Sequence, residues 1–476
     1  MVNNLRYISY LSFILVFFWG CRVPQIAMEE ANKEVPETFS PDLVDTVNVA
    51  NVDWREYFDD DQLIALIDTA LQNNQELNIV LQEIEISKNE ILERSGEYLP
   101  FVDIGLGSGL EKPGRFTPAG AVEHTLEVEP GREFPDPLGD FIVGATASWE
   151  VDIWRKLRNA RDAAELRYLA NTQGKNFLVT QLIAEIAESY YELMALDNLL
   201  QIINQNLVIQ ADALKKAELL KNNAKATQLA VNRFKAQLIN TQNQQYAILQ
   251  KRVETENRIN FLIARYPQPI DRNSTSFINL KLDSIQAGIP AQLLQNRPDV
   301  RQAEYELRAF NLDILSARAN FYPSLDLKAG VGFQAFNPAF LLNPESILFN
   351  LAGDLVAPLI NRKAITARYN MASAAQVQSV YHYQQTLLNA YVDVQNQLMK
   401  LQNYSNSFDT KKREVELLNE SVRVANNLFR FAKADYVEVL LTQEEALDAQ
   451  MELVEAKLHQ VHAKVQIYRA LGGGWQ

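Results

Sequence analysis

A gap-free internal repeat constrains the fold of this chain more than any other feature of its sequence. Leu294 follows Leu71 by 223 positions, and Pro323 follows Pro100 by the same 223 positions. Further identical residues keep this spacing: Glu83 and Glu306, Ile91 and Ile314, Leu92 and Leu315, Asp103 and Asp326, Gly107 and Gly330, and Gly109 and Gly332. A repeat of this kind predicts one structural unit built twice.

The two copies are expected at residues 52–270 and 289–476, with an irregular inter-repeat segment at 271–288. The chain has 476 residues, of which 47% are apolar. This composition predicts a folded chain with a large core and argues against disorder.

Each copy contains two runs in which apolar residues alternate with small or charged residues, the pattern of a strand with two different faces. The runs lie at about 100–110 and 140–150 in the first copy and at about 323–333 and 346–357 in the second. Each run is long enough for a tilted strand to cross a bilayer. The alternation alone fits a membrane β-barrel and two hairpins half buried on a soluble core equally well. In a barrel, the lumen-facing positions would be Asp103, Ser324, Asp326, Lys328 and Asp354.

Most of the remaining sequence predicts long helices. Proline-free stretches with apolar residues at three- and four-residue spacing lie at about 159–222, 227–263, 366–431 and 436–471. A helix of about 65 residues is a rod of roughly 100 Å. Such a rod needs parallel neighbours along its length. The helices, together with the N-terminus, therefore favour the barrel.

The N-terminus has the organisation of an export signal. Arg6 precedes a short apolar run at residues 11–18, and Gly20 and Cys21 follow. Cys21 is the only cysteine of the chain, so no internal disulfide can form. The arrangement resembles a bacterial lipoprotein signal, in which residues 1–20 are removed, Cys21 is acylated and residues 21–51 form a lipid-anchored tether. The alternatives are an ordinary signal peptide cleaved nearby and an incidental core cysteine.

Charge and missing motifs exclude several classes of function. The formal net charge is −14 and no basic tract is present, which argues against nucleic acid as a partner. The sequence contains no nucleophile elbow, phosphate loop or zinc-protease motif, so we expect neither an enzyme nor a cofactor. His459 and His462 stand one helical turn apart but lack a third ligand nearby, so no metal site is predicted.

A motif in the second copy is specific enough to suggest a family. Arg297, Pro298 and Asp299 are followed by Glu304, and the helix that contains them leads to Pro323 before the strand. The motif resembles that of the outer-membrane factor family, the TolC-like channels. It is most similar to the lipoprotein branch that serves RND efflux pumps, and the resemblance covers nearly the whole chain.

This resemblance implies a mixed α+β fold, in which a transmembrane β-barrel is continued by a long α-helical coiled-coil barrel. Four strands cannot close a barrel, and open sheet edges do not survive in lipid. Two chains would give a barrel too narrow for a channel, whereas three chains leave a lumen. We therefore expect a lipid-anchored homotrimer in the outer membrane that extends into the periplasm.

The turns between the long helices also correspond to each other, since residues 224–231 match residues 432–439 at a spacing of 208 positions. Thr227 and Asp435 are expected as N-caps of the returning helices. The resemblance implies that these turns form the periplasmic gate and the docking site for an adaptor. The residues concerned are Ala224, Thr227, Phe429, Arg430, Ala432, Asp435 and Glu438.

Three of these residues have expected roles. Phe429 corresponds to the gate aromatic of the family and Glu438 to its first acidic position, although Glu438 could also merely cap its helix. Three Glu438 carboxylates that meet at a tip repel one another. Arg430 is the expected latch that holds the tip closed against this repulsion.

The resemblance predicts an outer-membrane channel of a tripartite efflux system. The channel would be a passive exit duct for small molecules or metal ions, driven by an inner-membrane RND transporter through a periplasmic adaptor, or membrane fusion protein. A type I secretion duct for polypeptides and a non-channel coiled-coil envelope scaffold are the alternatives. The motif at 297–299 and Cys21 favour the efflux branch, and no motif indicates the exported substrate.

Overall fold

The computed structural model describes residues 23–26, 28–39, 47–280, 286–358, 362–431 and 433–475. Cys21 and Ala432, two of the predicted functional residues, lie outside the described residues. The chain divides into two compact units. Unit 1 takes in Met1–Glu30, Glu85–Tyr168 and Tyr305–Val380, and unit 2 takes in Ala31–Ile84, Leu169–Glu304 and Tyr381–Gln476. Each unit thus draws residues from both halves of the sequence.

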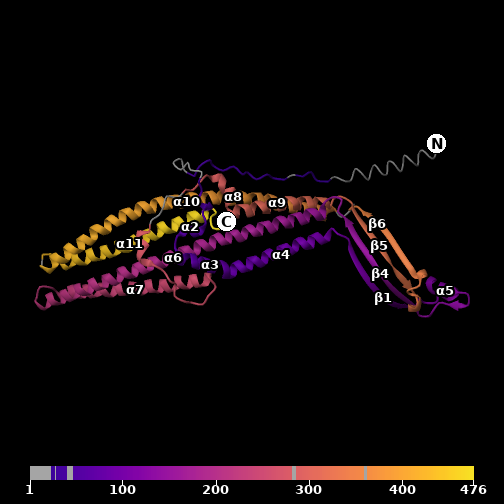
Figure 1. Cartoon of the computed structure of the whole chain (residues 1–476), viewed down its shortest axis with the longest axis horizontal. Helices are drawn as coiled ribbons and strands as arrows, with labels where there is room; N and C mark the ends of the chain where they lie inside the picture. The colour runs from indigo at the N-terminus through magenta and orange to yellow at the C-terminus, as the bar shows by residue number, and fades with distance from the viewer. Residues whose placement is uncertain are drawn as a thin grey trace. The chain divides into compact units, whose positions relative to one another are not determined.

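Unit 1 contains a four-stranded sheet (Figure 1). Its strands are β1 (Phe101–Glu111), β4 (Leu138–Val151), β5 (Ser324–Ala335) and β6 (Ile347–Val356), in the order β1-β4-β5-β6. All three pairings are antiparallel. The pairing of β4 with β5 joins a strand from the first half of the chain to a strand from the second half, so both halves contribute to one sheet.

The register gives this sheet two chemically different faces. Asp326 lies opposite Asp354, and Lys328 lies opposite Ser148. Paired residues of antiparallel strands point to the same side of a sheet, and side chains alternate between the two sides along each strand. The five positions predicted to face a lumen therefore share one face, which is here called the polar face. The other face, here called the apolar face, presents large side chains that are between 71% and 86% exposed: Ile104, Leu106, Leu110, Phe349, Leu351 and Leu355.

The connection between β1 and β4 is rich in glycine and proline, but it contains regular structure. It contains α5 (Pro118–Thr125) and a small hairpin of β2 (Glu127–Glu129) and β3 (Arg132–Glu133). The helix begins here because the Thr117 side chain accepts a hydrogen bond from the backbone N–H of Gly120, and Pro118 suits the first helical position. The β5–β6 connection holds two short 3-10 turns, η4 (Pro338–Phe340) and η5 (Pro344–Ser346).

Long helices make up most of the described chain. They are α4 (Gln75–Glu97), α6 (Lys156–Asn222), α7 (Gln228–Leu262), α9 (Pro298–Ala319), α10 (Arg362–Arg430) and α11 (Tyr436–Ala470). α6 has 67 residues and α10 has 69 residues, so each is roughly 100 Å long. Within the described part of the chain, none of the helices combines the length and the apolar character that a membrane crossing requires.

Two short helices dock onto the core of unit 2. They are α2 (Trp54–Phe58) and α3 (Asp61–Asn73), and they pack against α6 and α11. The ring of Tyr57 stacks on that of Tyr468 with centroids 4.2 Å apart. Asp60 caps α3 by accepting hydrogen bonds from two backbone N–H groups of its first turn, and it accepts another from the Tyr190 hydroxyl. The acidic run at 59–61 is therefore a helix cap tied to the core.

The inter-repeat segment connects the two pairs of long helices in unit 2. Arg272 forms ion pairs with Asp197 of α6 at 2.7 Å and with Glu256 of α7 at 2.9 Å. Burial opposes ionisation of Asp197, but the hydrogen bonds and charge of Arg272 hold the pKa of this carboxyl below its usual value. Leu280 lies eight residues after Arg272, and its carbonyl oxygen accepts a hydrogen bond from Lys457 of α11 at 2.6 Å. The segment is thus fastened on both sides of η2 (Ser274–Asn279). Shorter elements flank it: η1 (Val49–Asn51), η3 (Pro290–Gln292) and α8 (Leu293–Asn296).

The buried ammonium of Lys457 should make the free energy of unfolding rise with pH in the alkaline range. It is 4% exposed, and burial together with the charge of Lys464 lowers the pKa of Lys457 to about 8. An unfolded lysine has a pKa of about 10.4, so the folded chain releases this proton first and stability rises with pH between about 8 and 10. We expect the free energy of unfolding of the wild type, relative to Lys457→Met, to increase over this range in detergent. Parallel pH profiles of the two proteins would contradict this.

Candidate functional site

The polar face carries charged residues that the sequence spreads over two distant segments. The Lys328 ammonium lies 3.3 Å from Asp354 Oδ2 across the β5–β6 pair. The Ser324 hydroxyl donates to Asp326 Oδ2 at 3.2 Å. Like charges opposite each other destabilise a sheet, and these contacts offset the repulsion between Asp326 and Asp354. The sheet thus brings four of the predicted positions together, whereas Asp103 lies on β1 with β4 between.

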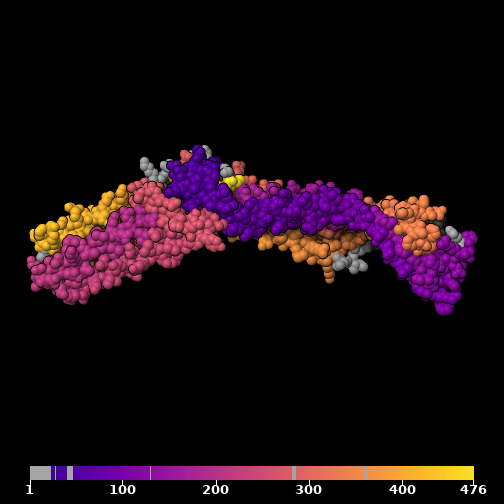
Figure 2. All heavy atoms as spheres, turned by 60° about the horizontal axis from the view of Figure 1, so that its bottom comes forward, coloured from indigo at the N-terminus to yellow at the C-terminus, as the bar shows by residue number. Residues whose placement is uncertain are grey.

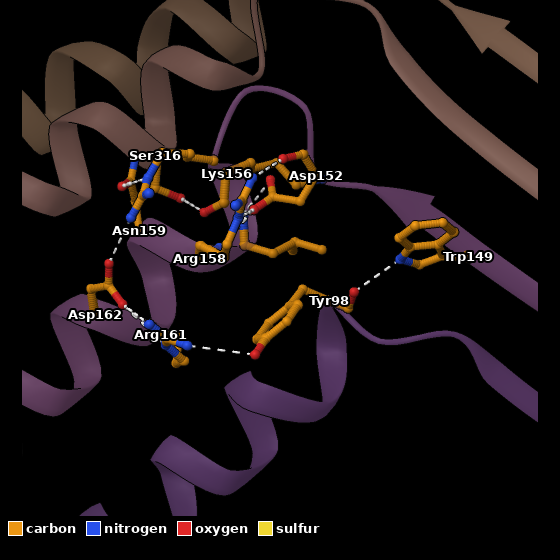
Figure 3. Close-up of polar contacts among 11 residues, drawn as sticks. Tyr98, Trp149, Asp152, Lys156, Arg158, Asn159, Arg161, Asp162 and Ser316 are labelled. Atoms are coloured by element: carbon orange, nitrogen blue, oxygen red, sulfur yellow. Dashed lines mark hydrogen bonds and ion pairs between the residues drawn. The ribbon is translucent and has the colours of Figure 1, made fainter.

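The end of the sheet where strands continue into helices is here called the foot, and it comprises residues 149–158 and 316–324 (Figure 3). The Asp152 carboxylate accepts hydrogen bonds from two backbone N–H groups at the start of α6, at 3.0 and 3.1 Å, and from the Arg158 side chain at 3.1 Å. Burial raises the pKa of Asp152, but these bonds outweigh it and the pKa is lowered. This cap explains why α6 begins at Lys156, earlier than the apolar spacing predicts.

The two helical turns lie side by side at one end of unit 2, where the surfaces of α6–α7 and α10–α11 run alongside each other (Figure 2). Phe234 of α7 and Phe429 of α10 meet there with ring centroids 6.0 Å apart. Both rings belong to an apolar cluster that also contains Ala217, Val231 and Val439. The two helical hairpins of the chain are therefore joined by an apolar contact next to their turns.

The first turn has the backbone geometry expected for glycine. Ala224 has a φ of 55°, which lies in the left-handed region that alanine adopts only at a cost. Thr227 accepts a hydrogen bond from the backbone N–H of Ala230 at 3.2 Å, which confirms it as the N-cap of α7. Asp435 occupies the corresponding position before α11, but its side chain makes no capping hydrogen bond. The predicted N-cap position of Asp435 is therefore confirmed, whereas the side-chain hydrogen bond expected there is not formed.

The structure places the predicted gate residues in different environments. Phe429 is 8% exposed against Phe234, so its ring packs inside the chain and does not project from it as a gate aromatic would. Arg430 is exposed, with its guanidinium 4.8 Å from the centroid of the Phe431 ring. Glu438 is exposed in the first turn of α11. Among the described residues, no ion pair links Arg430 to Glu438.

The predicted family motif forms a buried ionic cluster in unit 2. Arg297 is 6% exposed and forms an ion pair with Asp299 at 2.6 Å. Its guanidinium also donates to the carbonyl oxygen of Ala470 at the end of α11, and it lies 3.5 Å from Asp393 of α10. Asp393 in turn pairs with Arg469 at 3.0 Å. Burial lowers the pKa of Arg297, but the hydrogen bond and charge of Asp299 more than compensate, so the pKa is raised.

The other members of the motif have structural partners. Pro298 is the first residue of α9, where the missing N–H of proline costs nothing. The Glu304 carboxylate pairs with the Lys33 ammonium at 2.7 Å. The carbonyl oxygen of Pro323 accepts a hydrogen bond from Trp154 Nε1 at 2.8 Å. The motif therefore fixes chain junctions and supplies no reactive group.

The sequence of the chain matches a known protein family over most of its length. Residues 66–265 and 289–473 match the family described as outer membrane efflux protein. The chain belongs to the outer membrane efflux protein family. This efflux protein is an outer-membrane efflux channel, as its resemblance to the TolC-like channels predicts.

Individual relatives agree with this family. The efflux protein is 27% identical over 451 residues to the cation efflux system protein CusC of Escherichia coli O6:H1, with 93% of each chain covered. It is 26% identical over 425 residues to the solvent efflux pump outer membrane protein SrpC of Pseudomonas putida, with 88% of this chain and 87% of that protein covered. Its fold matches the open state of the Neisseria gonorrhoeae MtrE outer membrane channel with a TM-score of 0.80, at 21% identity over 96% of this chain and 99% of that chain.

Sequence patterns did not reveal how the tether of this efflux protein is held. The Gln376 side chain is fully buried, and its amide donates to the carbonyl oxygen of Glu29 at 2.8 Å and accepts from the N–H of Glu29 at 3.3 Å. In unit 2, Phe39 stacks on Tyr391 with ring centroids 5.6 Å apart. A buried glutamine that binds a peptide backbone has no local sequence signal, because Gln376 stands among other polar residues of a long helix.

The two histidines singled out by their spacing have separate partners. His459 stacks on Tyr404 with ring centroids 4.8 Å apart, and His462 Nε2 lies 3.1 Å from the carbonyl oxygen of Glu188. Burial lowers the pKa of His462. Within the described ranges, no three His, Cys, Asp or Glu side chains are arranged to hold a metal ion.

Proposed function

We propose that three copies of this chain form the outer-membrane exit duct of a tripartite efflux system. The observation that carries the proposal is the four-stranded sheet, which exposes large apolar side chains on one face and charged side chains on the other. Side chains such as Leu106 and Leu351, more than 80% exposed, favour contact with lipid over contact with water. The charged face then lines a water-filled lumen.

The open edges of the sheet support the trimer. β1 and β6 are the terminal strands of the order β1-β4-β5-β6. Unpaired backbone groups at such edges are costly in a bilayer. Pairing β6 of one copy with β1 of the next satisfies them, and three copies give about twelve strands with room for a lumen.

The long helices support a periplasmic extension of the duct. Each copy supplies two hairpins, α6–α7 and α10–α11, and the turns of these hairpins form the docking site for a periplasmic adaptor. The adaptor connects the duct to an inner-membrane RND transporter, which supplies the energy. The duct itself is passive and exports small molecules or metal ions.

Deletion of the gene tests this function and its substrate class. The deletion strain should become sensitive either to metal cations or to organic solvents, because CusC is named a cation efflux protein and SrpC a solvent efflux pump protein. Copper, silver and dyes are tested as representative compounds. A plasmid-borne copy should restore resistance. Loss of a secreted polypeptide with unchanged resistance to all these compounds would favour a type I secretion duct instead.

Acylation of Cys21 anchors the duct in our proposal. Cys21→Ala should abolish incorporation of radioactive palmitate, because Cys21 is the only cysteine of the chain. The labelled wild type should be found in outer-membrane fractions. Palmitate labelling that persists in the variant would contradict the assignment.

Two tip variants test the gate. Arg430→Ala should raise leak conductance in planar bilayers, because it removes a cation next to the carboxylates that meet at the tip. Glu438→Ala should mainly lower the preference for cations, measured as a shift of reversal potential in a salt gradient. Identical currents from both variants and the wild type would show that the tip is assigned wrongly.

A further inference from the structure

The tether runs along α10 within unit 1. The Gln376 amide holds the backbone of Glu29, and the hydroxyl of Tyr369 donates to the carbonyl oxygen of Gln25 at 2.9 Å. From Gln376 to Tyr369, the contact points move towards the start of α10, the end nearer to β6 in the chain. Following the tether from Glu29 back to Gln25 therefore leads towards the foot of the sheet.

The first described residues of the tether lie at the foot. Arg318 of α9 donates from Nε to the carbonyl oxygen of Pro24 at 3.0 Å, and Val23 packs against an apolar cluster that contains Phe321. Cys21 stands three residues before Pro24, and three residues span at most about 11 Å. In the proposed lipoprotein, the acyl chains on Cys21 therefore enter lipid within about this distance of Pro24.

A stack of one cationic and two aromatic side chains lies at this place. The Arg318 guanidinium is 5.9 Å from the centroid of the Tyr322 ring, and Tyr322 stacks on Trp154 with centroids 4.5 Å apart. Trp154 is 45% exposed although its N–H is bonded to a carbonyl oxygen. Arg318, Tyr322 and Trp154 are here called the foot stack. Rings with one polar end and an exposed apolar body are typical of the membrane–water interface.

Arg318 differs from the other cations of the foot in its partners within the described part of the chain. Arg158 pairs with Asp152, and Arg155 pairs with Asp162. Among the described residues, Arg318 contacts a backbone carbonyl and an aromatic ring and has no carboxylate partner. Its guanidinium can therefore bond a phosphate without first breaking an ion pair.

We propose that the foot stack binds phospholipid headgroups of the leaflet that holds the Cys21 anchor, and that Arg318 bonds the phosphate of an anionic lipid. This inference rests on the proposed membrane duct and extends it by naming the residues at headgroup level. The foot stack supplies a headgroup contact on the protein surface next to the anchor.

Depth-dependent quenching of tryptophan fluorescence tests the position of the stack. One protein keeps Trp154, with Trp54, Trp149 and Trp475 replaced by phenylalanine. A second has all four replaced by phenylalanine and carries Leu351→Trp, in the middle of β6 on the apolar face. Both are reconstituted into vesicles whose lipids carry a quencher either at the headgroup or on the acyl chain. Trp154 should be quenched most by the headgroup quencher, and the tryptophan of Leu351→Trp most by the acyl-chain quencher.

The two tryptophans separate the possible failures. If Leu351→Trp responds to lipid quenchers while Trp154 responds only to iodide in the water, the duct stands and the foot stack is not at the headgroups. If neither tryptophan responds to lipid quenchers, the sheet does not cross the membrane and the proposed function fails as well.

Lipid retention tests the role of Arg318. Native mass spectrometry should show that the wild type retains phosphatidylglycerol in preference to phosphatidylethanolamine. Arg318→Gln keeps a donor for the carbonyl of Pro24 but should lower this preference about fivefold, the ratio expected for roughly 1 kcal/mol per basic residue at an anionic surface. Arg155→Gln is the matched control, because Arg155 is paired with Asp162. Equal loss in both variants, or no loss in either, would overturn the role of Arg318.

Discussion

Arg297→Leu should destabilise unit 2 by about 3–5 kcal/mol, the usual cost of removing one partner from a buried ionic cluster. The guanidinium holds Asp299, the end of α11 and Asp393 together. Without it, Asp393 keeps Arg469, but Asp299 loses the ion pair that compensates its burial. We expect a large decrease in the midpoint of thermal unfolding in detergent.

A surface arginine provides the control for this prediction. Arg423 of α10 pairs with Glu420, but its side chain is 69% exposed. Solvent-exposed ion pairs contribute little to stability, so Arg423→Leu should leave the unfolding midpoint nearly unchanged. Similar midpoints for Arg297→Leu and Arg423→Leu would show that the motif cluster does not stabilise the fold.

Cysteines on the two faces of the sheet should react very differently in membranes. Leu351 lies on the apolar face and is 81% exposed, and Lys328 lies on the polar face with 63% of its side chain exposed. In a soluble hairpin both positions would react with a charged thiol reagent. In a membrane duct, Lys328→Cys should react faster than Leu351→Cys by more than about tenfold, because the hydrocarbon region excludes water.

The same two variants carry their own control. Unfolding both proteins in denaturant should equalise their reaction rates, since lipid no longer covers either position. Equal rates in intact membranes would contradict the assignment of the faces.

Regular elements could be predicted from the sequence because their periods are local. The alternation in β5 repeats every second residue, and the absence of proline from α10 leaves its helical period uninterrupted. α5 was missed although its start is encoded locally: Thr117 and Pro118 form an N-cap and a first helical position. The N-cap at Asp152 was not predicted either, because the apolar period of a helix shows its buried face but does not show the residue at which the helix begins.

Contacts between distant segments could not be predicted in this way. The resemblance to the family makes Phe429 a gate residue, but Phe234, almost 200 residues earlier in the chain, packs against the Phe429 ring and buries it. The clamp of Gln376 on Glu29 likewise depends on how the tether lies, which no periodicity encodes. The site residues on the sheet were easier to predict, because one strand register assigns all of them to a face together.

Single-channel recording of the purified wild-type protein in planar bilayers tests the central claim most directly. If the chain forms a trimeric duct, the current should rise in discrete steps of uniform size, and the reversal potential in a salt gradient should report the charge of the lumen. Protein that is acylated, folded and inserted in the bilayer but gives no steps would contradict the account and would favour a non-channel scaffold.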